Sequence, residues 1–478
     1  MIYCKRLTDP VDLTGSMLRN YFKGASPMPS RIMGFLAAVL CCFFLTAPSL
    51  SDEVTVIHAG RLLAIPGQNP SGPATIVVRD GRIASVDAGT IRSDSVAGDD
   101  TSVTVIDLSD RFVLPGMMDA HVHVMAQPSA FIRNAMRRGS PLNKSDLAMH
   151  GVLYAQRTLA AGFTTIRDVG SNDESIFALR NAINRGDIPG PTILAAGPVI
   201  SATGGHADRG NGATTTLDPD ERFSNGVCDG ATECMRTVRH LKQLGADLIK
   251  FTATGGFMSD TGTQQQYDAD EMRAIIETAH QRGMKVAAHA YDGGAIAEAV
   301  AAGVDSIEHG WMLDDAGIRL MKKNGTYLVP TLLISRPSSW AKMAGTGKAA
   351  GLRDEYRAFE KAYAKGVNIA FGTDVGIFDH GQNALEFDVM VELGMTNADA
   401  IRAATVNTAA LFGLTDQAGT IEVGKRADLI AVDGDPLEDI SVLRRVEFVM
   451  KEGIIYKEGG TYVGTISVRP TGKPVSLQ

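Results

Sequence analysis

A regular alternation of short strand-like runs with helix-like stretches constrains the fold more than any other feature of this sequence. Residues 268–282 and 294–302 are examples of the helix-like stretches. Such alternation is typical of a parallel sheet whose strands are joined by crossover helices. Eight strands are predicted: one that carries His121 and His123, then 164–168, 192–196, 247–252, 285–289, 304–309, 326–331 and 367–374. We therefore predict an α/β fold built on a (β/α)8 TIM barrel.

Short β-branched runs at both ends of the chain predict a small second domain. The N-terminal part contains Asp80-Gly81 between two of its runs, which is a hairpin signal. We expect both ends to form one β-sandwich from the runs 54–57, 75–78, 83–86, 103–106, 427–432, 446–450 and 453–456. The predicted organisation is a leader at 1–51, sandwich segments at 52–112 and 419–478, and a barrel at 113–418.

The N-terminal residues have the layout of a secretory signal. Arg31 precedes a short apolar segment at 34–45, and small residues follow up to Ser51. The apolar segment is too short for a comfortable membrane span. We predict a secreted or periplasmic protein, processed near Ser51, with no stable membrane span after processing. An uncleaved N-terminal anchor is the alternative.

Charge and cysteine content narrow the possible partners and the compartment. The net charge of −8 and the absence of a basic stripe argue against a nucleic-acid partner. Cys228 and Cys234 are the two cysteines that remain after removal of the leader. They could close a small loop in an oxidising compartment or stay as two thiols, and spacing does not decide between these alternatives.

Side chains that commonly bind metals fall at the ends of the predicted strands. His121 and His123 are separated by one residue, so on a strand both point to the same face. His289, His309 and Asp374 each end a predicted strand, and Lys250 lies near the end of another. In such a barrel, the carboxyl ends of the strands converge on one site. Any one of the six could be structural, but their shared placement predicts a metal centre.

Lys250 lies among apolar residues, which indicates a buried amine. An ammonium group beside metal cations would be repelled, so the neutral amine is favoured there. A neutral amine can add carbon dioxide and become a carbamate, a ligand with two oxygens that can bridge two ions. The alternative is an ordinary lysine whose ammonium group reaches solvent beyond the strand end.

The sequence from residue 54 onward resembles the amidohydrolase superfamily. The motifs that carry the resemblance are PGMMDAHVHV, GFTTIRDVG, GADLIKFTATGG, VAAHAYDG, SIEHG, FGTDVG and GTIEVGKRADLIAVDGDP. They look most like the binuclear branch related to imidazolonepropionase, which includes prolidase-like and Xaa-Arg dipeptidases and ochratoxin-hydrolysing amidases. Imidazolonepropionase itself uses one metal and no bridging lysine, so Lys250 argues against that activity.

The resemblance implies a role for each ligand residue. His121, His123 and Asp374 would bind the more buried ion, His289 and His309 the second ion, and carboxylated Lys250 would bridge them. The ions are two divalent cations, and zinc is expected from the imidazole and oxygen ligands. They would activate a bridging hydroxide, and Asp374 would carry its proton to the leaving nitrogen.

Substrate contacts are less constrained by the sequence. His206 lies in a glycine-rich loop after the third strand, and Tyr291 follows His289 by two residues. By resemblance, both help to hold a substrate carboxylate; a loop histidine and a packing tyrosine are the alternative. Arg209 and Arg336 are further candidates without a spacing argument. The remaining histidines are interpreted as structural or surface residues: His58, His150, His240, His280 and His380.

These observations predict a metal-dependent hydrolase that cleaves an amide bond in a dipeptide or N-acyl amino acid, with ochratoxin-like amides included. Hydrolysis of a cyclic amide, a lactone or a phosphotriester is the alternative within enzymes. A mononuclear enzyme follows if Lys250 is not carboxylated, and a non-catalytic binding protein is the alternative outside enzymes. The expected partner is a small-molecule or dipeptide substrate, and relatives suggest a homo-oligomer.

Overall fold

The computed structural model describes residues 54–92, 95–96, 102–127, 144–211, 219–257, 261–335 and 353–464. All of these residues belong to the second of two units in the chain, which spans Asp52–Gln478. The predicted leader at 1–51 and the candidate Arg336 lie outside the described residues. No helix among the described residues is long and apolar enough to cross a membrane.

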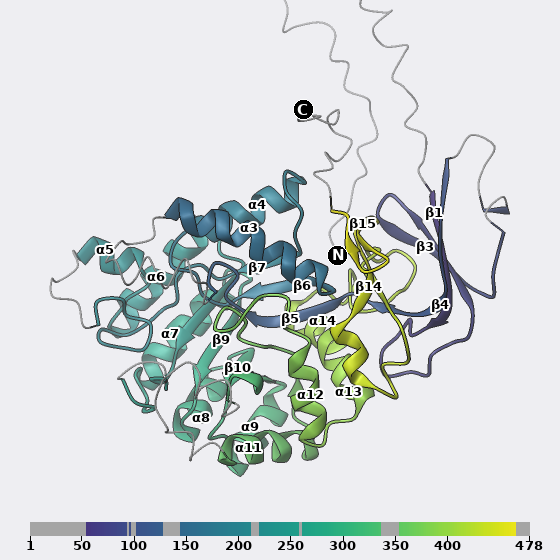
Figure 1. Ribbon diagram of the computed structural model, residues 1–478. Coiled ribbons are helices and arrows are strands. Elements are labelled where there is room, and N and C mark those ends of the chain that lie inside the picture. The colour runs from purple at the N-terminus through teal and green to yellow at the C-terminus, as the bar shows by residue number, and fades with distance from the viewer. Residues whose placement is uncertain are drawn as a thin grey trace, which may run out of the picture. The chain divides into compact units, whose positions relative to one another are not determined.

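Eight parallel strands form the predicted barrel (Figure 1). Three of them pair in the order β5-β6-β7 and five in the order β12-β11-β10-β9-β8. Parallel bridges between Val122 and Val375 and between Ile200 and Phe251 join the two sheets into a closed ring. The strands are β5 (Met117–Val122), β6 (Phe163–Asp168), β7 (Thr192–Ala195), β8 (Leu248–Thr252), β9 (Lys285–Ala290), β10 (Ser306–His309), β11 (Tyr327–Val329) and β12 (Asn368–Ile369).

Helices follow the strands as expected for crossover connections (Figure 1). In α7 (Ala269–His280), the buried Met272, Ile275, Ile276 and Ala279 recur at three- and four-residue spacing, and Asp268 forms a capping box at its start. The other helices are α3 (Lys144–Ala160), α4 (Ser175–Arg185), α5 (Pro219–Ser224), α6 (Gly230–Leu244), α8 (Gly293–Ala301), α9 (Asp315–Asn324), α11 (Arg353–Ala364), α12 (Leu385–Glu392), α13 (Asn397–Arg402) and α14 (Thr408–Phe412). Short 3-10 or π segments are η2 (Leu333–Ser335), η4 (Ala403–Asn407) and η5 (Ile440–Arg444).

The β-sandwich predicted from both chain ends is present as an additional β-sheet made of strands from both ends. They make one continuous sheet of order β16-β15-β14-β13-β4-β1-β2-β3, in which the antiparallel β4–β13 pair joins the two ends. The strands are β1 (Val54–Leu62), β2 (Ala74–Arg79), β3 (Arg82–Ala88), β4 (Val103–Pro115), β13 (Leu429–Val432), β14 (Val446–Lys451), β15 (Ile454–Glu458) and β16 (Thr461–Tyr462).

The two faces of this sheet pack into different hydrophobic cores. On β13, Ile430 and Val432 pack into the large barrel core, whereas Leu429 and Ala431 pack into a separate apolar cluster within the sheet. This alternation follows from the two-residue period of a strand. Only Gly116 separates β4 from β5, so the sheet fixes the start of the strand that carries the histidines.

Candidate metal centre and its pocket

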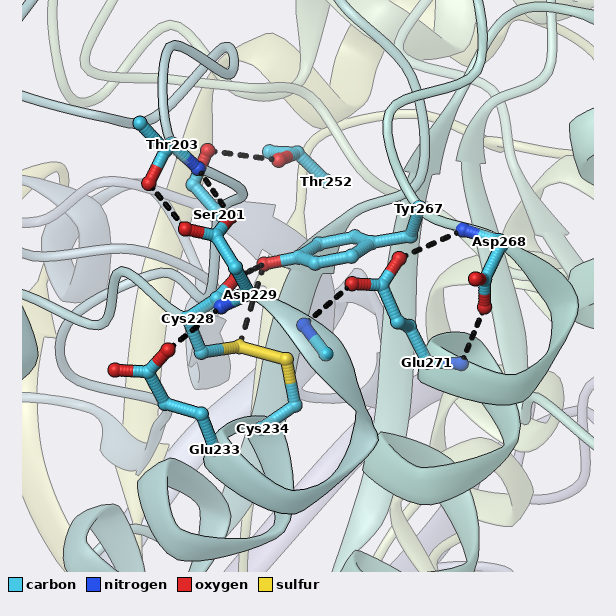
Figure 2. The surroundings of a disulfide bond; sticks show 11 residues. Ser201, Thr203, Cys228, Asp229, Glu233, Cys234, Thr252, Tyr267, Asp268 and Glu271 are labelled. Atoms are coloured by element: carbon cyan, nitrogen blue, oxygen red, sulfur yellow. Dashed lines mark hydrogen bonds between the residues drawn. A yellow bond between two sulfur atoms is a disulfide. The ribbon is translucent and has the colours of Figure 1, made fainter.

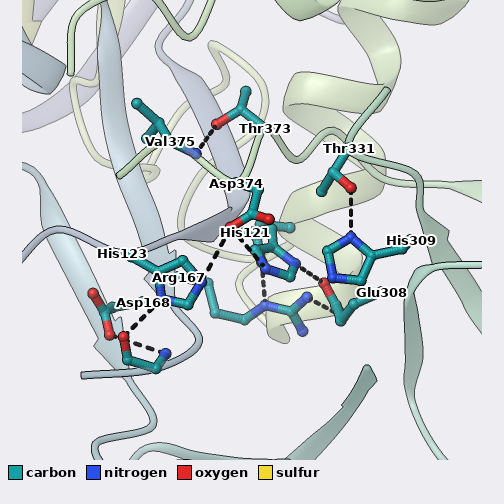
Figure 3. A network of polar contacts seen from close by, with 12 residues as sticks. His121, His123, Arg167, Asp168, Glu308, His309, Thr331, Thr373, Asp374 and Val375 are labelled. Atoms are coloured by element: carbon teal, nitrogen blue, oxygen red, sulfur yellow. Dashed lines mark hydrogen bonds and ion pairs between the residues drawn. The ribbon is translucent and has the colours of Figure 1, made fainter. Parts of the chain in front are cut away.

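The six predicted ligand residues lie at one end of the barrel. His121, Lys250, His289 and His309 belong to β5, β8, β9 and β10, while His123 follows β5 directly and Asp374 lies five residues after the end of β12. The imidazole rings of His121 and His309 are 4.9 Å apart between centroids, and those of His289 and His309 are 4.7 Å apart. Figure 3 shows Asp374 beside the rings of His121 and His123, with His309 facing them.

His121, His123 and Asp374 form the tightest group. One ligand atom from each lies within 4.8 Å of the others. Asp374 Oδ1 lies 3.1 Å from His123 Nε2 and 3.5 Å from His121 Nε2. The side chain of His123 is 27% exposed and that of His121 only 1%. Solvent therefore reaches these three residues on the His123 side.

Hydrogen bonds on the far side of each imidazole orient the four histidines. His121 Nδ1 donates to Glu308 Oε2 at 2.7 Å, and His123 Nδ1 donates to the Gly170 carbonyl at 2.7 Å. His309 Nδ1 is hydrogen-bonded to Thr331 Oγ1 at 2.6 Å, and His289 Nε2 donates to the Gly255 carbonyl at 3.1 Å. The carboxylate and carbonyl partners assign the proton of three rings, in their neutral form, to the outer nitrogen, which leaves the inner nitrogens of His121, His123 and His289 free to bind a metal. The Thr331 hydroxyl can either accept from His309 Nδ1 or donate to it.

The inner ring nitrogens of the histidines and Asp374 Oδ1 are suitable ligand atoms for a cation. Asp374 Oδ1 is buried and lacks a hydrogen-bond partner among the described residues. His123 Nε2 is the nearest ring nitrogen of the group, at 3.1 Å from this oxygen. A buried carboxylate oxygen without a donor is costly unless a cation compensates it. The donor set therefore fits a divalent metal ion.

Burial keeps three of the histidines in the neutral form that a metal requires. It lowers the pKa of His121, His289 and His309 well below the usual value, and the nearby Lys250 lowers each further. For His123, burial would lower the pKa, but the Asp374 carboxylate outweighs it and raises the pKa above its usual value.

Lys250 is buried beside these groups, with 4% of its surface exposed. Burial lowers its pKa to about 8, although the charges of Glu308 and Asp374 oppose the shift. Within the described part of the chain, its amine makes no hydrogen bond or ion pair. The alternative of an ammonium group that reaches solvent does not match this burial.

The backbone is strained at three positions around the centre. His309, Thr331 and Asp374 have φ values of 70°, 47° and 61°, in the left-handed region that side chains usually avoid. Such conformations cost on the order of 1–3 kcal/mol each and are concentrated at functional sites. The strain aims the Asp374 carboxylate and the His309 ring inward.

Sequence reasoning missed a buried ion pair behind His121. Arg167 Nη2 donates to Glu308 Oε1 at 2.8 Å, and Arg167 Nε donates to the Ala120 carbonyl at 2.6 Å (Figure 3). Both side chains are almost completely buried. The sequence feature that could have indicated this pair is the presence of Arg167 and Glu308 inside the apolar strands β6 and β10. A buried charge is rarely left unpaired.

A cavity of about 380 Å³ opens next to the group. His123 and His206 both line it, together with Arg209. The His206 ring stacks on the His289 ring at 4.4 Å, and burial lowers the pKa of His206 to about 4. The structure therefore places His206 against His289 and at the edge of the cavity that His123 also lines.

Tyr291 lies beside the other histidines, outside the lining of this cavity. Its ring is 4.8 Å from His289 and stacks on His309 at 5.3 Å. It also packs against Trp311 at 5.0 Å, as part of an aromatic cluster.

A disulfide between Cys228 and Cys234 holds the segment that supports the His206 loop, which settles the question left open by spacing (Figure 2). The Cys228 amide donates to the Ser201 carbonyl at 3.0 Å. Asp229 accepts hydrogen bonds from the Thr203 amide at 2.9 Å and from the Thr203 hydroxyl. The loop that carries His206 and Arg209 is therefore hydrogen-bonded, near its start, to the segment that the disulfide cross-links.

The other histidines contact residues outside the ligand group. His58 pairs with Thr75, and His280 with Asp305 at 2.8 Å. His150 lies against Tyr154, and His240 against Phe223. His380 is buried and contacts Thr158 Oγ1 at 3.0 Å and the carbonyls of His123 and Ala126.

Comparisons with known proteins place this geometry in a family. The profile of the Amidohydrolase family matches residues 112–456. Ochratoxinase from Aspergillus niger is 30% identical over 438 residues, which cover 85% of this chain and 88% of that protein. A crystal structure of a Xaa-Pro dipeptidase with bound methionine is 40% identical, with a TM-score of 0.78, and covers 84% of this chain and 100% of its own.

A crystal structure of a prolidase complexed with N-methylphosphonate-L-proline is also similar. It is 32% identical with a TM-score of 0.74, over 85% of this chain and 100% of its own. The chain belongs to the amidohydrolase family, in the branch that contains prolidases, ochratoxinase and imidazolonepropionases.

Proposed function

We propose that this amidohydrolase is a binuclear, metal-dependent enzyme that cleaves the amide bond of a dipeptide or an N-acyl amino acid. One observation carries the proposal: His121, His123 and Asp374 direct one ligand atom each at one point, within 4.8 Å of each other. Similarity to a Xaa-Pro dipeptidase, a prolidase and ochratoxinase supports the choice of amide bonds, including ochratoxin-like amides.

Burial and orientation of the side chains support the proposed ligand assignment. His121, His123 and Asp374 are the proposed ligands of one ion, and His289 and His309 those of a second ion. Lys250 is buried without a partner for an ammonium group, which supports a neutral amine that adds carbon dioxide to form a bridging carbamate. Zinc is the proposed metal because imidazole nitrogens and carboxylate oxygens suit it.

The side chains of the site have separate proposed roles in the reaction. When bound, the two ions polarise the scissile carbonyl and lower the pKa of water. The Asp374 carboxylate accepts the proton of the attacking water and delivers it to the leaving nitrogen. His206, which lines the cavity, and Tyr291, which lies beside His289 and His309, help to position the substrate.

The test is hydrolysis of a panel of dipeptides and N-acyl amino acids by the purified protein, with a lactone, a cyclic amide and a phosphotriester on the same plate. We expect turnover of the open-chain amides and a fall in kcat of at least about a hundredfold in Asp374→Asn. Asp433→Asn is the matched control because the side chain of Asp433 is 80% exposed. Turnover confined to a lactone, a cyclic amide or a phosphotriester would contradict the proposal, as would metal-loaded protein without turnover.

We also infer that the protein is exported. The disulfide between Cys228 and Cys234 supports an oxidising compartment, because cytosolic thiols are usually kept reduced. Expression of the full chain with a C-terminal tag, followed by cell fractionation, tests this inference. Retention of the unprocessed chain in the cytosol would contradict it.

A further inference from the structure

We propose that Asp119 is a positioning residue for Asp374. Together with the Thr373 hydroxyl, its carboxylate holds the backbone at Asp374 in the conformation that presents this side chain to His121 and His123. The proposal rests on the proposed function, which makes Asp374 a metal ligand and the carrier of the proton. It goes beyond that function because Asp119 is neither a proposed ligand nor part of the described cavity lining.

Asp119 is completely buried in β5 and binds two separate segments of the chain. Its Oδ1 accepts hydrogen bonds from the amides of His121 at 3.0 Å and Thr373 at 3.1 Å. Its Oδ2 accepts from the Thr373 hydroxyl at 2.6 Å and from the side-chain amide of Asn383 at 2.8 Å. These hydrogen bonds use the lone-pair positions of both oxygens. One carboxylate therefore joins the strand of His121 to the segment that contains Asp374.

The Thr373 hydroxyl forms a bridge across Asp374. It accepts a hydrogen bond from the Val375 amide at 3.1 Å (Figure 3). It also donates to Asp119, so both of its hydrogen-bonding functions are used. Asp374 lies between Thr373 and Val375 and has a φ of 61°, in the left-handed region that residues with a side chain rarely adopt. A threonine hydroxyl that binds the amide two residues later stabilises a local backbone conformation of this kind.

Main-chain contacts align the same segment with β5. The Asp374 amide donates to the His121 carbonyl at 2.7 Å. Gly372 approaches the strand so closely that a Cβ atom at this position would lie 3.0 Å from His121 Cβ. The main chain thus sets the separation between the segment and the strand. The side chains of Asp119 and Thr373 add the hydrogen bonds that compensate for the strained backbone of Asp374.

Loss of the bridge is expected to change the ligand group. Asp374 Oδ1 lies 3.1 Å from His123 Nε2 and 3.5 Å from His121 Nε2, so its place depends on the backbone of residue 374. Without the bridge, this backbone can relax from the unfavourable left-handed conformation and withdraw the carboxylate. We expect weaker metal binding and slower proton transfer as a result. A merely structural role of Asp119 predicts lower stability with unchanged metal affinity in the folded protein.

Titration of the metal-free protein with zinc and a competing chelator measures the metal affinity. Thr373→Val removes the hydroxyl and keeps the shape of the side chain, and we expect zinc affinity to fall about 10- to 100-fold. Thr373→Ser keeps the hydroxyl and is expected to restore most of the affinity. Thr237→Val is the matched control because its buried hydroxyl has no hydrogen-bond partner among the described residues. Equal affinity of Thr373→Val and the control, both shown by melting curves to be folded, would overturn the proposal.

A double-mutant cycle tests whether Asp119 acts through Thr373. The amide nitrogen of Asp119→Asn faces two of the four donors in either orientation, so we expect lower zinc affinity in this variant too. Because both substitutions break one link, the double variant should lose less affinity than the product of the two single losses. Losses that multiply in full would overturn the link. If Asp119→Asn does not fold, the comparison of Thr373→Val with Thr373→Ser decides the proposal.

Turnover of an amide that the substrate panel identifies separates this proposal from the proposed function. In zinc-saturated Thr373→Val we expect kcat to fall at least about tenfold and KM to change less than about twofold, with kcat recovered in Thr373→Ser. A rise in KM with unchanged kcat would overturn the positioning of the proton carrier. Wild-type protein that binds zinc and hydrolyses no member of the panel would refute the proposed function. The zinc affinities of the Thr373 variants would then still decide whether Asp374 is positioned as a ligand.

Discussion

Glu308 connects Arg167 to His121: one carboxylate oxygen accepts from Arg167 Nη2 at 2.8 Å and the other from His121 Nδ1 at 2.7 Å. Ser306 Oγ also donates to Glu308 at 2.5 Å. The pair is almost completely buried, and it fixes the tautomer and orientation of His121 from behind. A proposed metal ligand is thus positioned by a charge pair that does not itself line the cavity.

Glu308→Gln tests this positioning role. A glutamine can present its amide nitrogen to His121 Nδ1, which would disfavour the tautomer that leaves Nε2 free. We expect metal affinity to fall about 10- to 100-fold, measured by titration of the metal-free protein with zinc and a competing chelator. The melting temperature of the metal-free variant is the control, because a change in affinity at constant stability separates positioning from unfolding. Unchanged affinity would show that the pair is only structural.

Thr331→Val removes the hydroxyl that binds His309 Nδ1 at 2.6 Å while keeping the shape of the side chain. His309 is a proposed ligand of the second ion only, so we expect loss of one metal equivalent at low zinc and retention of the other. Thr331→Ser keeps the hydroxyl and is expected to bind both. Equal loss of both ions from Thr331→Val would contradict the division of ligands between two sites.

Lys250→Met should change how the stability of the metal-free protein depends on pH. The pKa of Lys250 is about 8 in the folded protein, below its usual value of 10.5. Between these two values the unfolded chain binds the extra proton, so the contribution of Lys250 to stability rises with pH. The rise is about 3 kcal/mol over this window. Below pH 8 both states are protonated and the cost of the buried charge is fully present.

Urea denaturation at pH 7.5 and pH 10 measures this difference. We expect the metal-free wild type to gain more stability between these pH values than Lys250→Met, and the variant to be the more stable protein at pH 7.5. An identical pH dependence in both proteins would show that Lys250 is not a buried amine in solution.

The Cys228–Cys234 disulfide should matter for stability and for substrate binding. Removal of a cross-link across a separation of six residues costs about 2 kcal/mol in the chain-entropy account. Because Cys228 and Asp229 support the loop of His206, we expect Cys228→Ser with Cys234→Ser to raise KM more than it lowers kcat. Melting curves and kinetics with and without a reductant measure both effects, and the double variant should be insensitive to the reductant. A reductant effect that persists in the double variant would contradict this account.

Much of the fold could be predicted because strand and helix periods are local properties of the sequence. The eight barrel strands fall where short apolar runs occur, and the predicted ligand residues lie in these strands or shortly after their carboxyl ends. The Arg167–Glu308 pair could not be predicted in the same way, because its partners are separated by 141 residues. The positive φ values of Thr331 and Asp374 also depend on tertiary contacts rather than on residue type.

The order of the terminal strands in the sheet could not be predicted from the sequence either. The runs near both ends indicated one β unit, but their order depends on which edges meet, and β4 of the N-terminal part pairs with β13 of the C-terminal part. Arg209 had no spacing argument in the sequence, and only the cavity lining distinguishes it from other arginines.

The metal content of the purified full-length protein, expressed with zinc and bicarbonate available, tests the central claim most directly. Inductively coupled plasma mass spectrometry should find about two divalent ions per chain in the wild type, and fewer in Lys250→Met, with amide hydrolysis lost on chelation and restored by zinc. One ion or none in the wild type, or two ions in Lys250→Met, would contradict the proposed binuclear centre bridged by Lys250.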